Sequence, residues 1–256
     1  MTRLPTRLRP FLPLAAFSAA VLLAAWSAPR RAAPELLPAA VPLSAPAAER
    51  THHHLLALAP GLRPDVFARA LGAWRRAAAE GTARRPVLTI IDYSLPSTER
   101  RLWVLDLERG RLLFHEFVAH GRRTGENLAR RFSNRVGSNQ TSLGVFVTGD
   151  TYVGRNGYSL RLRGLERGFN DQAERRAIVV HGADYVSPEL AGRTGRLGRS
   201  QGCPAVRPEI AAALIDEIKG GSVVFSWYPD PRYARATRLA VPAPLDEPGD
   251  SLAAAS

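Results

Sequence analysis

The chain has 256 residues, and its 35 Lys and Arg residues against 23 Asp and Glu residues give a formal net charge of +12. This length is compatible with one domain that has a substantial core and additional terminal segments. A single cysteine excludes a disulfide within the chain. The basic balance suits an anionic partner, although a coding bias toward arginine accounts for it equally well, and no nucleic-acid-binding motif is recognisable.

The first residues are typical of a secretory signal peptide, which we expect over residues 1–27. Three arginines within the first nine residues precede an uncharged apolar run from Phe11 to Trp26. An uncleaved N-terminal anchor is the alternative, but the run is short for a membrane span and Pro13 interrupts it. Both interpretations place the remainder of the chain outside the cytoplasm, in the periplasm or cell envelope.

Composition divides the rest of the chain into three parts. Residues 28–61 are rich in Ala and Pro without a sustained period, and they predict a linker. Residues 231–256 have the same character and predict a flexible C-terminal tail. Residues 62–230 show helical and β-strand patterns, so we expect a single folded domain there.

This domain begins with a helix and continues mainly as β-strands. Apolar residues recur at helical spacing over 65–80, and Gly81 follows them. Later patterns predict strands over 87–93, 102–107, 112–119, 143–148, 158–162, 177–181 and 222–228, with a second helix over 209–219. The first three strands suggest an antiparallel meander. The polar segment 120–141 is long for a plain connection, as functional loops often are. The expected fold class is therefore mainly β with a few helices.

Cys203 lies between Gly202 and Pro204 and is compatible with a buried small residue, an intermolecular link or a reactive thiol. His181 ends a strand-like run, and the intervening loop is long enough to bring its imidazole onto the sulfur. Such a histidine takes the thiol proton, and the resulting ion pair stabilises the thiolate. Gly202 permits a tight turn whose backbone N–H groups can bind the oxyanion of a tetrahedral intermediate.

Spacing alone leaves other interpretations open, because one cysteine and six histidines always offer some pairing. A zinc site built from His120, His181 and either Asp184 or Cys203 is one alternative. The chain has neither a His-Glu-x-x-His motif nor paired cysteines, so we expect no metal and no other cofactor.

The segments AIVVHGADYVS and LGRSQGCPAV resemble the catalytic segment of the L,D-transpeptidases, and most closely the murein L,D-transpeptidase catalytic-domain family. Upstream, FVAHGRRTG, RFSNRVGSNQTSLGVFVTGDTYVGRNGYSLRLRGLE and FNDQAERR resemble the same family in the same order. The resemblance covers Pro86 to Val206. It implies a β-rich catalytic fold with Cys203 as the nucleophile, His181 as its base and no metal.

The resemblance also implies a substrate, the tetrapeptide stem of peptidoglycan. In the broader family the thiolate attacks the carbonyl of the third stem residue, expels the terminal D-alanine and passes the acyl group to an amine of another stem, which forms a 3–3 cross-link. Water or a lipoprotein lysine is the acceptor in some members. This chain departs from the broader family at Gln201, where that family has a histidine, and it lacks the arginine close behind the cysteine.

Five further residues are candidates for substrate binding, each with a structural alternative. Ser200 is equally compatible with a turn hydroxyl, Tyr185 with a packed aromatic and His120 with a solvated loop residue. Arg199 and Arg207 flank the cysteine and suit the carboxylates of a stem peptide, or they are solvated surface charges. The function hypotheses are an exported acyltransferase, a peptidase that hydrolyses the same thioester, and a non-catalytic wall-binding module. Peripheral association with the wall or membrane is compatible with each.

Overall fold

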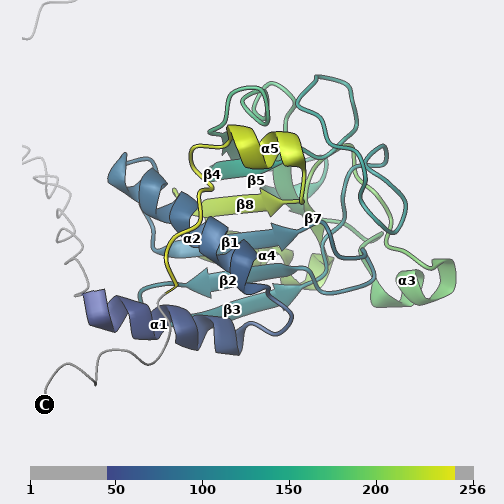
Figure 1. Ribbon diagram of the computed structural model, residues 1–256. Coiled ribbons are helices and arrows are strands. Elements are labelled where there is room, and N and C mark those ends of the chain that lie inside the picture. Colours follow the sequence, from purple (N-terminus) through teal and green to yellow (C-terminus); the bar gives the residue numbers. More distant parts are fainter. Residues whose placement is uncertain (1–44, 246–256) are drawn as a thin grey trace, which may run out of the picture. The chain divides into compact units, whose positions relative to one another are not determined.

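The computed structural model describes residues 45–245, which form five helices and an eight-stranded sheet (Figure 1). The strands are β1 (Val87–Asp92), β2 (Leu102–Asp106), β3 (Arg111–Glu116), β4 (Gly144–Gly154), β5 (Gly157–Gly164), β6 (Val179–Gly182), β7 (Ala205–Val206) and β8 (Val223–Trp227). The helices are α1 (Ala45–Leu58), α2 (Pro64–Ala79), α3 (Pro188–Thr194), α4 (Pro208–Ile218) and α5 (Pro231–Ala236). The signal peptide predicted over residues 1–27 lies outside the described residues, as do residues 28–44 and 246–256 of the predicted linker and tail.

The strands form one mixed sheet in the order β3-β2-β1-β8-β4-β5-β6-β7. Neighbouring strands are antiparallel except for two parallel pairs, β1 with β8 and β6 with β7. The antiparallel meander predicted for the first three strands is present, and the mainly β fold class with a few helices is confirmed.

Helices cover both faces of this sheet, so its central strands are buried on both sides. On one face, α1, α2 and α5 contribute Leu55, Phe67 and Tyr233 to the core. On the other face, α4 contributes Leu214 and Ile218. Strands β1 and β8 are therefore buried at every position instead of alternating between buried and exposed residues.

The prediction of a linker over residues 28–61 is wrong for its C-terminal part. Helix α1 occupies Ala45–Leu58, and Leu55 is fully buried in the core that it shares with α2. His52 is buried as well, with its ring edge-on to Phe67 at 6.4 Å between centroids. The run of histidines interrupts the apolar pattern in the sequence, so the helix was not predicted. In the structure the apolar residues of α1 pack against α2.

The prediction of a flexible tail over residues 231–256 is wrong for its first part. Asp230 caps α5, since its side chain accepts hydrogen bonds from two backbone N–H groups of that helix. Tyr233 is fully buried and donates to Glu166 at 2.8 Å. Further on, the Ala243 N–H donates to the Ala68 carbonyl at 2.8 Å, which fixes the chain against α2.

Two differences from the predicted strands shape the site. Strand β4 continues to Gly154, which places the turn between β4 and β5 at residues 154–157. Strand β6 begins at Val179 because Ala177 adopts a φ of 52°, which ends the extended conformation before it.

Helix α3 and the short strand β7 had no predicted counterpart. Within residues 45–245, no helix combines the length and apolar character that crossing a membrane requires.

Candidate active site

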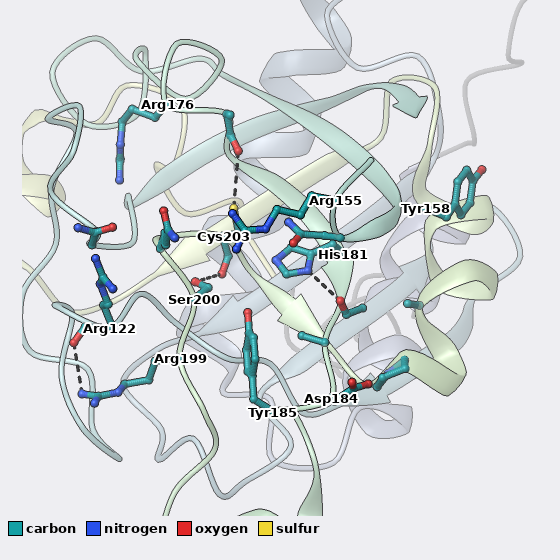
Figure 2. A pocket seen from close by; sticks show the side chains of 18 of the residues that line it. Arg122, Arg155, Tyr158, Arg176, His181, Asp184, Tyr185, Arg199, Ser200 and Cys203 are labelled. Atoms are coloured by element: carbon teal, nitrogen blue, oxygen red, sulfur yellow. Dashed lines mark hydrogen bonds between the residues drawn. The ribbon is translucent and has the colours of Figure 1, made fainter. Parts of the chain in front are cut away.

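Parallel pairing of β6 and β7 brings His181 and Cys203 to the same edge of the sheet. His181 is paired with Ala205, so the turn that ends at Cys203 immediately precedes this register position. Both side chains line one cavity of about 910 Å³ (Figure 2). The structure thus brings together the two residues that the sequence predicts to be the nucleophile and its base.

A hydroxyl bridge shapes the turn that carries the thiol. Ser200 Oγ accepts a hydrogen bond from the Gly202 N–H at 3.0 Å and donates one to the Cys203 carbonyl at 2.6 Å. Gly202 adopts a φ of 126°, and a β-carbon at this position would lie 2.8 Å from the Gln140 carbonyl oxygen. This position therefore requires glycine. The Cys203 N–H has no hydrogen-bond acceptor among the described residues.

The hydrogen bond of His181 sets its tautomer. Its Nδ1 lies 2.9 Å from the Gly182 carbonyl oxygen, which can only accept, so Nδ1 carries the proton. In the neutral ring, Nε2 is then the atom that can take a proton. Burial lowers the pKa of His181 below its ordinary value, because the charged imidazolium is poorly solvated there. The ring is therefore neutral at pH 7.

The Cys203 thiol is protonated in the resting site. Its Sγ donates to the Ala177 carbonyl at 3.7 Å. Burial raises the pKa of the thiol, and this effect outweighs a hydrogen bond from the Val179 backbone and the charge of Arg176, both of which lower it. The sequence predicted an ion pair with His181, whereas burial favours the neutral form of both groups, because desolvation disfavours both charged forms.

Arg176 is the cation whose charge lowers the pKa of the Cys203 thiol. The sequence predicted no role for it. Its guanidinium donates to the carbonyl oxygens of Ser133 and Gln140 and to the hydroxyl of Ser142, which connects segment 133–142 to a residue that lines the cavity. Its position in the FNDQAERR motif was the available signal, but nothing in that motif specifies which loop the side chain meets.

Residues 58–227, more than half of the chain, match the L,D-transpeptidase catalytic domain. The chain belongs to this family. No curated protein matches the chain.

Several solved structures are similar to it at low identity. An L,D-transpeptidase from Mycobacterium smegmatis has 17% identity and a TM-score of 0.34, with 56% of this chain and 59% of that chain covered. An L,D-transpeptidase from Stackebrandtia nassauensis has 14% identity and a TM-score of 0.34, with coverages of 72% and 92%. The helical cell shape determining protein Pgp2 from Campylobacter jejuni has 12% identity and a TM-score of 0.37, with coverages of 62% and 54%. The chain thus spans less than two thirds of the first of these structures.

Three of the five residues predicted to bind substrate in this L,D-transpeptidase-family chain line the cavity, namely Ser200, Tyr185 and Arg199. The Ser200 hydroxyl is engaged within the turn. Tyr185 packs against Gly198, and burial raises the pKa of its phenol to about 12. Arg199 forms an ion pair with Glu126 at 2.5 Å.

The other two, His120 and Arg207, are not among the cavity residues. His120 is buried, accepts from Arg101 through Nδ1 at 2.9 Å, and has a pKa lowered to about 4 by burial and by the charge of Arg101. Arg207 makes two hydrogen bonds to Glu116, at 3.0 and 2.6 Å. Both side chains support the segments that carry the site.

Other polar residues of the cavity are outside the set predicted to act in catalysis or to bind substrate, although Asp184 was named as a ligand of the alternative zinc site. They are Arg122, Asn139, Arg155, Asn156, Tyr158, Arg176, Asp184 and Gln201. Arg155 and Asn156 lie in the turn between β4 and β5, so only the paired hairpin brings them to the site. Among the described residues, no three His, Cys, Asp or Glu side chains are grouped to hold a metal ion.

Proposed function

We propose that this protein is an exported cysteine acyltransferase that acts on peptidoglycan stem peptides. The observation that carries the proposal is that His181 of β6 and Cys203, shortly before the paired strand β7, line one cavity in a chain of the L,D-transpeptidase catalytic-domain family. Catalytic roles are proposed for Cys203, His181 and the turn at Gly202.

The first step is acylation of Cys203. His181 Nε2 takes the thiol proton as the sulfur attacks the carbonyl carbon of the third stem residue. The Cys203 N–H, which has no acceptor among the described residues, supports binding of the oxyanion. The proposed role of Gly202 is therefore to allow the conformation of the turn, because its own N–H already donates to the Ser200 hydroxyl. The tetrahedral intermediate collapses, the bond to the terminal D-alanine nitrogen breaks, and His181 returns the proton to the leaving amine.

The second step transfers the acyl group. An amine of another stem attacks the thioester carbonyl, His181 takes a proton from that amine, and the carbon–sulfur bond breaks to regenerate the Cys203 thiolate, which is then reprotonated. The product is a 3–3 cross-link. With water as the acceptor, the same steps give a shortened stem, which is the hydrolase alternative.

The proposal also places the protein in the periplasm or cell envelope. The N-terminal pattern over residues 1–27 and the net charge of +12 support export and a peripheral association with an anionic wall or membrane. Intact mass measurement of protein isolated from the cell envelope tests this. We expect a mass that lacks the signal segment, and an uncleaved chain in the cytoplasm would contradict export.

The central experiment incubates the protein with tetrapeptide muropeptides and identifies products by mass spectrometry. We expect an acyl adduct on Cys203, release of D-alanine and cross-linked dimers, and none of these with Cys203→Ala. Tripeptide products without dimers would assign hydrolysis. A wild-type protein that forms no adduct with either muropeptides or a carbapenem would contradict an enzymatic role and favour a wall-binding module.

A further inference from the structure

The cavity around Cys203 is strongly cationic. Four arginines line it, whereas Asp184 is the single carboxylate among its lining residues. Because His181 and Cys203 are both neutral in the resting site, these arginines determine the charge that an incoming substrate meets. A cavity of this kind attracts anionic groups.

Two of the four arginines are held by the protein itself. Arg199 forms an ion pair with Glu126 at 2.5 Å and donates to the Gly125 carbonyl at 3.1 Å. Arg176 donates to the Ser133 carbonyl at 2.7 Å and has further partners in the same segment. Arg176 engages both of its terminal nitrogens in these bonds, and Arg199 engages its Nη1 atom, so each of these guanidiniums already has protein partners.

The other two, Arg122 and Arg155, have exposed side chains that make no hydrogen bond or ion pair within the described residues. Their backbones are nevertheless fixed. The Arg122 N–H donates to the Ser200 carbonyl at 2.8 Å, beside the turn that ends at Cys203. Arg155 lies between Gly154 and Gly157, which pair across the hairpin, and Figure 2 shows its side chain extending over the cavity.

These two arginines approach the nucleophile from different sides. Arg122 follows the segment that pairs with the Ser200 turn, through the bridge between Gly121 and Ser200. Arg155 belongs to the hairpin whose second strand, β5, pairs Ser159 with His181. Arg155 is thus on the His181 side of the cavity, and His181 is the group that returns a proton to the leaving amine.

We propose that Arg155 binds the carboxylate of the terminal, leaving residue of the donor stem and that Arg122 binds a second carboxylate on the acyl part of the same stem. This inference rests on the proposed function and narrows its substrate class to donor peptides whose carboxylates are free rather than amidated. A carboxylate matches the planar fork of a guanidinium, and an amide does not. It also moves the predicted carboxylate contacts from Arg199 and Arg207, whose guanidiniums are paired with Glu126 and Glu116, to the two unpaired guanidiniums.

The test compares Arg155→Gln and Arg122→Gln with Arg163→Gln, an exposed arginine of β5 that is not among the cavity residues. Initial rates of thioester formation are measured with three synthetic tetrapeptides: the free acid, the form amidated at its terminal carboxylate, and the form amidated on its third residue. For the free acid we expect a loss in kcat/KM of about tenfold or more in each cavity variant and none in Arg163→Gln. With the terminally amidated donor, Arg155→Gln and wild type become equal, and with the other amidated donor, Arg122→Gln and wild type become equal.

Two further measurements separate this inference from the proposed function. Alkylation of Cys203 by iodoacetamide, which is neutral, should be equal in all variants, so a loss with peptides is a loss of recognition. Calorimetric binding of the free-acid peptide to Cys203→Ala, with and without each arginine substitution, tests the carboxylate contacts without catalysis. Unchanged affinity and unchanged kcat/KM in both cavity variants would overturn the inference and leave the acyltransferase proposal intact. Weakened binding with no acylation in any protein would support the subsite and contradict the proposed reaction.

Discussion

The Nη2 atom of Arg176 lies 3.1 Å from the position that a β-carbon on Gly202 would occupy. The guanidinium therefore fills the space beside the residue that precedes Cys203, the proposed nucleophile. Because the same side chain bonds to segment 133–142, Arg176 connects this segment to the surroundings of the turn at Cys203. The geometry of the thiol thus depends on residues that are far apart in the chain.

Replacement of Gly202 by alanine should displace this turn. The new β-carbon would stand 2.8 Å from the Gln140 carbonyl oxygen, and a φ of 126° is unfavourable for any residue with a β-carbon. We expect a loss of about 1–3 kcal/mol in the free energy of unfolding and slower alkylation of Cys203. Urea denaturation and iodoacetamide labelling measure these effects. Gly192→Ala is the control, because that helical glycine has open space at its β-carbon position and should tolerate the change.

Arg176→Gln should raise the pKa of Cys203 further. Burial already holds this pKa above the ordinary thiol value, and the charge of Arg176 opposes that shift. The thiolate population of the variant therefore appears only at higher pH, and the alkylation midpoint moves upward. Arg175→Gln, an exposed neighbour with no assigned contact to the thiol, should leave the profile unchanged. A midpoint that is identical in Arg176→Gln and wild type would remove Arg176 from the electrostatics of the thiol.

His181→Ala should separate resting reactivity from catalysis. The imidazole is neutral and is not among the causes of the thiol shift, so the pH profile of iodoacetamide alkylation should change little. Acylation by a stem peptide should nevertheless fall by about 100-fold or more, because the general base and acid is lost. An alkylation midpoint that rises strongly in this variant would show instead the ion pair that the sequence predicted.

The acid limb of the wild-type rate should lie below pH 6.5, the ordinary pKa of histidine. In the proposed reaction His181 acts as a base only when it is neutral, so activity should fall as the pH drops through its pKa. Burial lowers that pKa, and the fall is therefore displaced toward acid. Acylation rates measured from pH 4 to pH 8 test this, and a half-maximal rate above pH 6.5 would contradict it.

Sequence patterns predicted most of the sheet from its apolar, β-rich runs, and they predicted helices α2 and α4 from the helical spacing of their apolar residues. Helices α1 and α5 were missed for different reasons. In α1 the run His52 to His54 conceals the apolar face, and α5 has 6 residues, of which only Tyr233 is buried. The pairing of Cys203 with His181 was predicted from spacing and family resemblance. Their protonation states were not, because burial depends on what the rest of the chain packs around them.

The cavity arginines illustrate the same limit. Arg199 and Arg207 lie close to Cys203 in sequence, yet Glu126 and Glu116 engage their guanidiniums. Arg155 and Arg176 are distant in sequence and reach the cavity only because β5 pairs with both β4 and β6. Proximity along the chain therefore pointed to the turn at Cys203 and to Arg199, but not to the cavity arginines that come from distant segments.

Arg101→Lys should destabilise the segment from Val118 to His120, which continues to the bridge between Gly121 and Ser200. Arg101 is fully buried, and its guanidinium donates to the Val118 and Leu95 carbonyls and to His120. An ammonium cannot reproduce this fork, so buried carbonyl oxygens lose their donors. We expect a loss of about 3 kcal/mol in the free energy of unfolding. Arg100→Lys, one residue away and exposed, should lose little, and equal effects of the two substitutions would contradict this account.

Glu166 makes the stability of the C-terminal anchor depend on pH. Its buried carboxylate accepts hydrogen bonds from the Val145 N–H, the Tyr233 hydroxyl and the Thr237 hydroxyl, yet burial raises its pKa above the ordinary value. A raised folded-state pKa means that the folded protein holds this proton more tightly than the unfolded chain. The stability that this supplies is full below the unfolded pKa and is lost as the pH rises through the folded one.

Tyr233→Phe should therefore cost more at neutral pH than at pH 4. At neutral pH the substitution removes a donor from a buried carboxylate, for which we expect a loss of about 1–3 kcal/mol, whereas a protonated Glu166 needs that donor less. Tyr158→Phe removes the same group from a bond to Asp216, which is more than half exposed, and should cost little at either pH. Urea denaturation of the two variants at both pH values decides the matter. A cost of Tyr233→Phe that does not change with pH would mean that Glu166 is not the titrating partner.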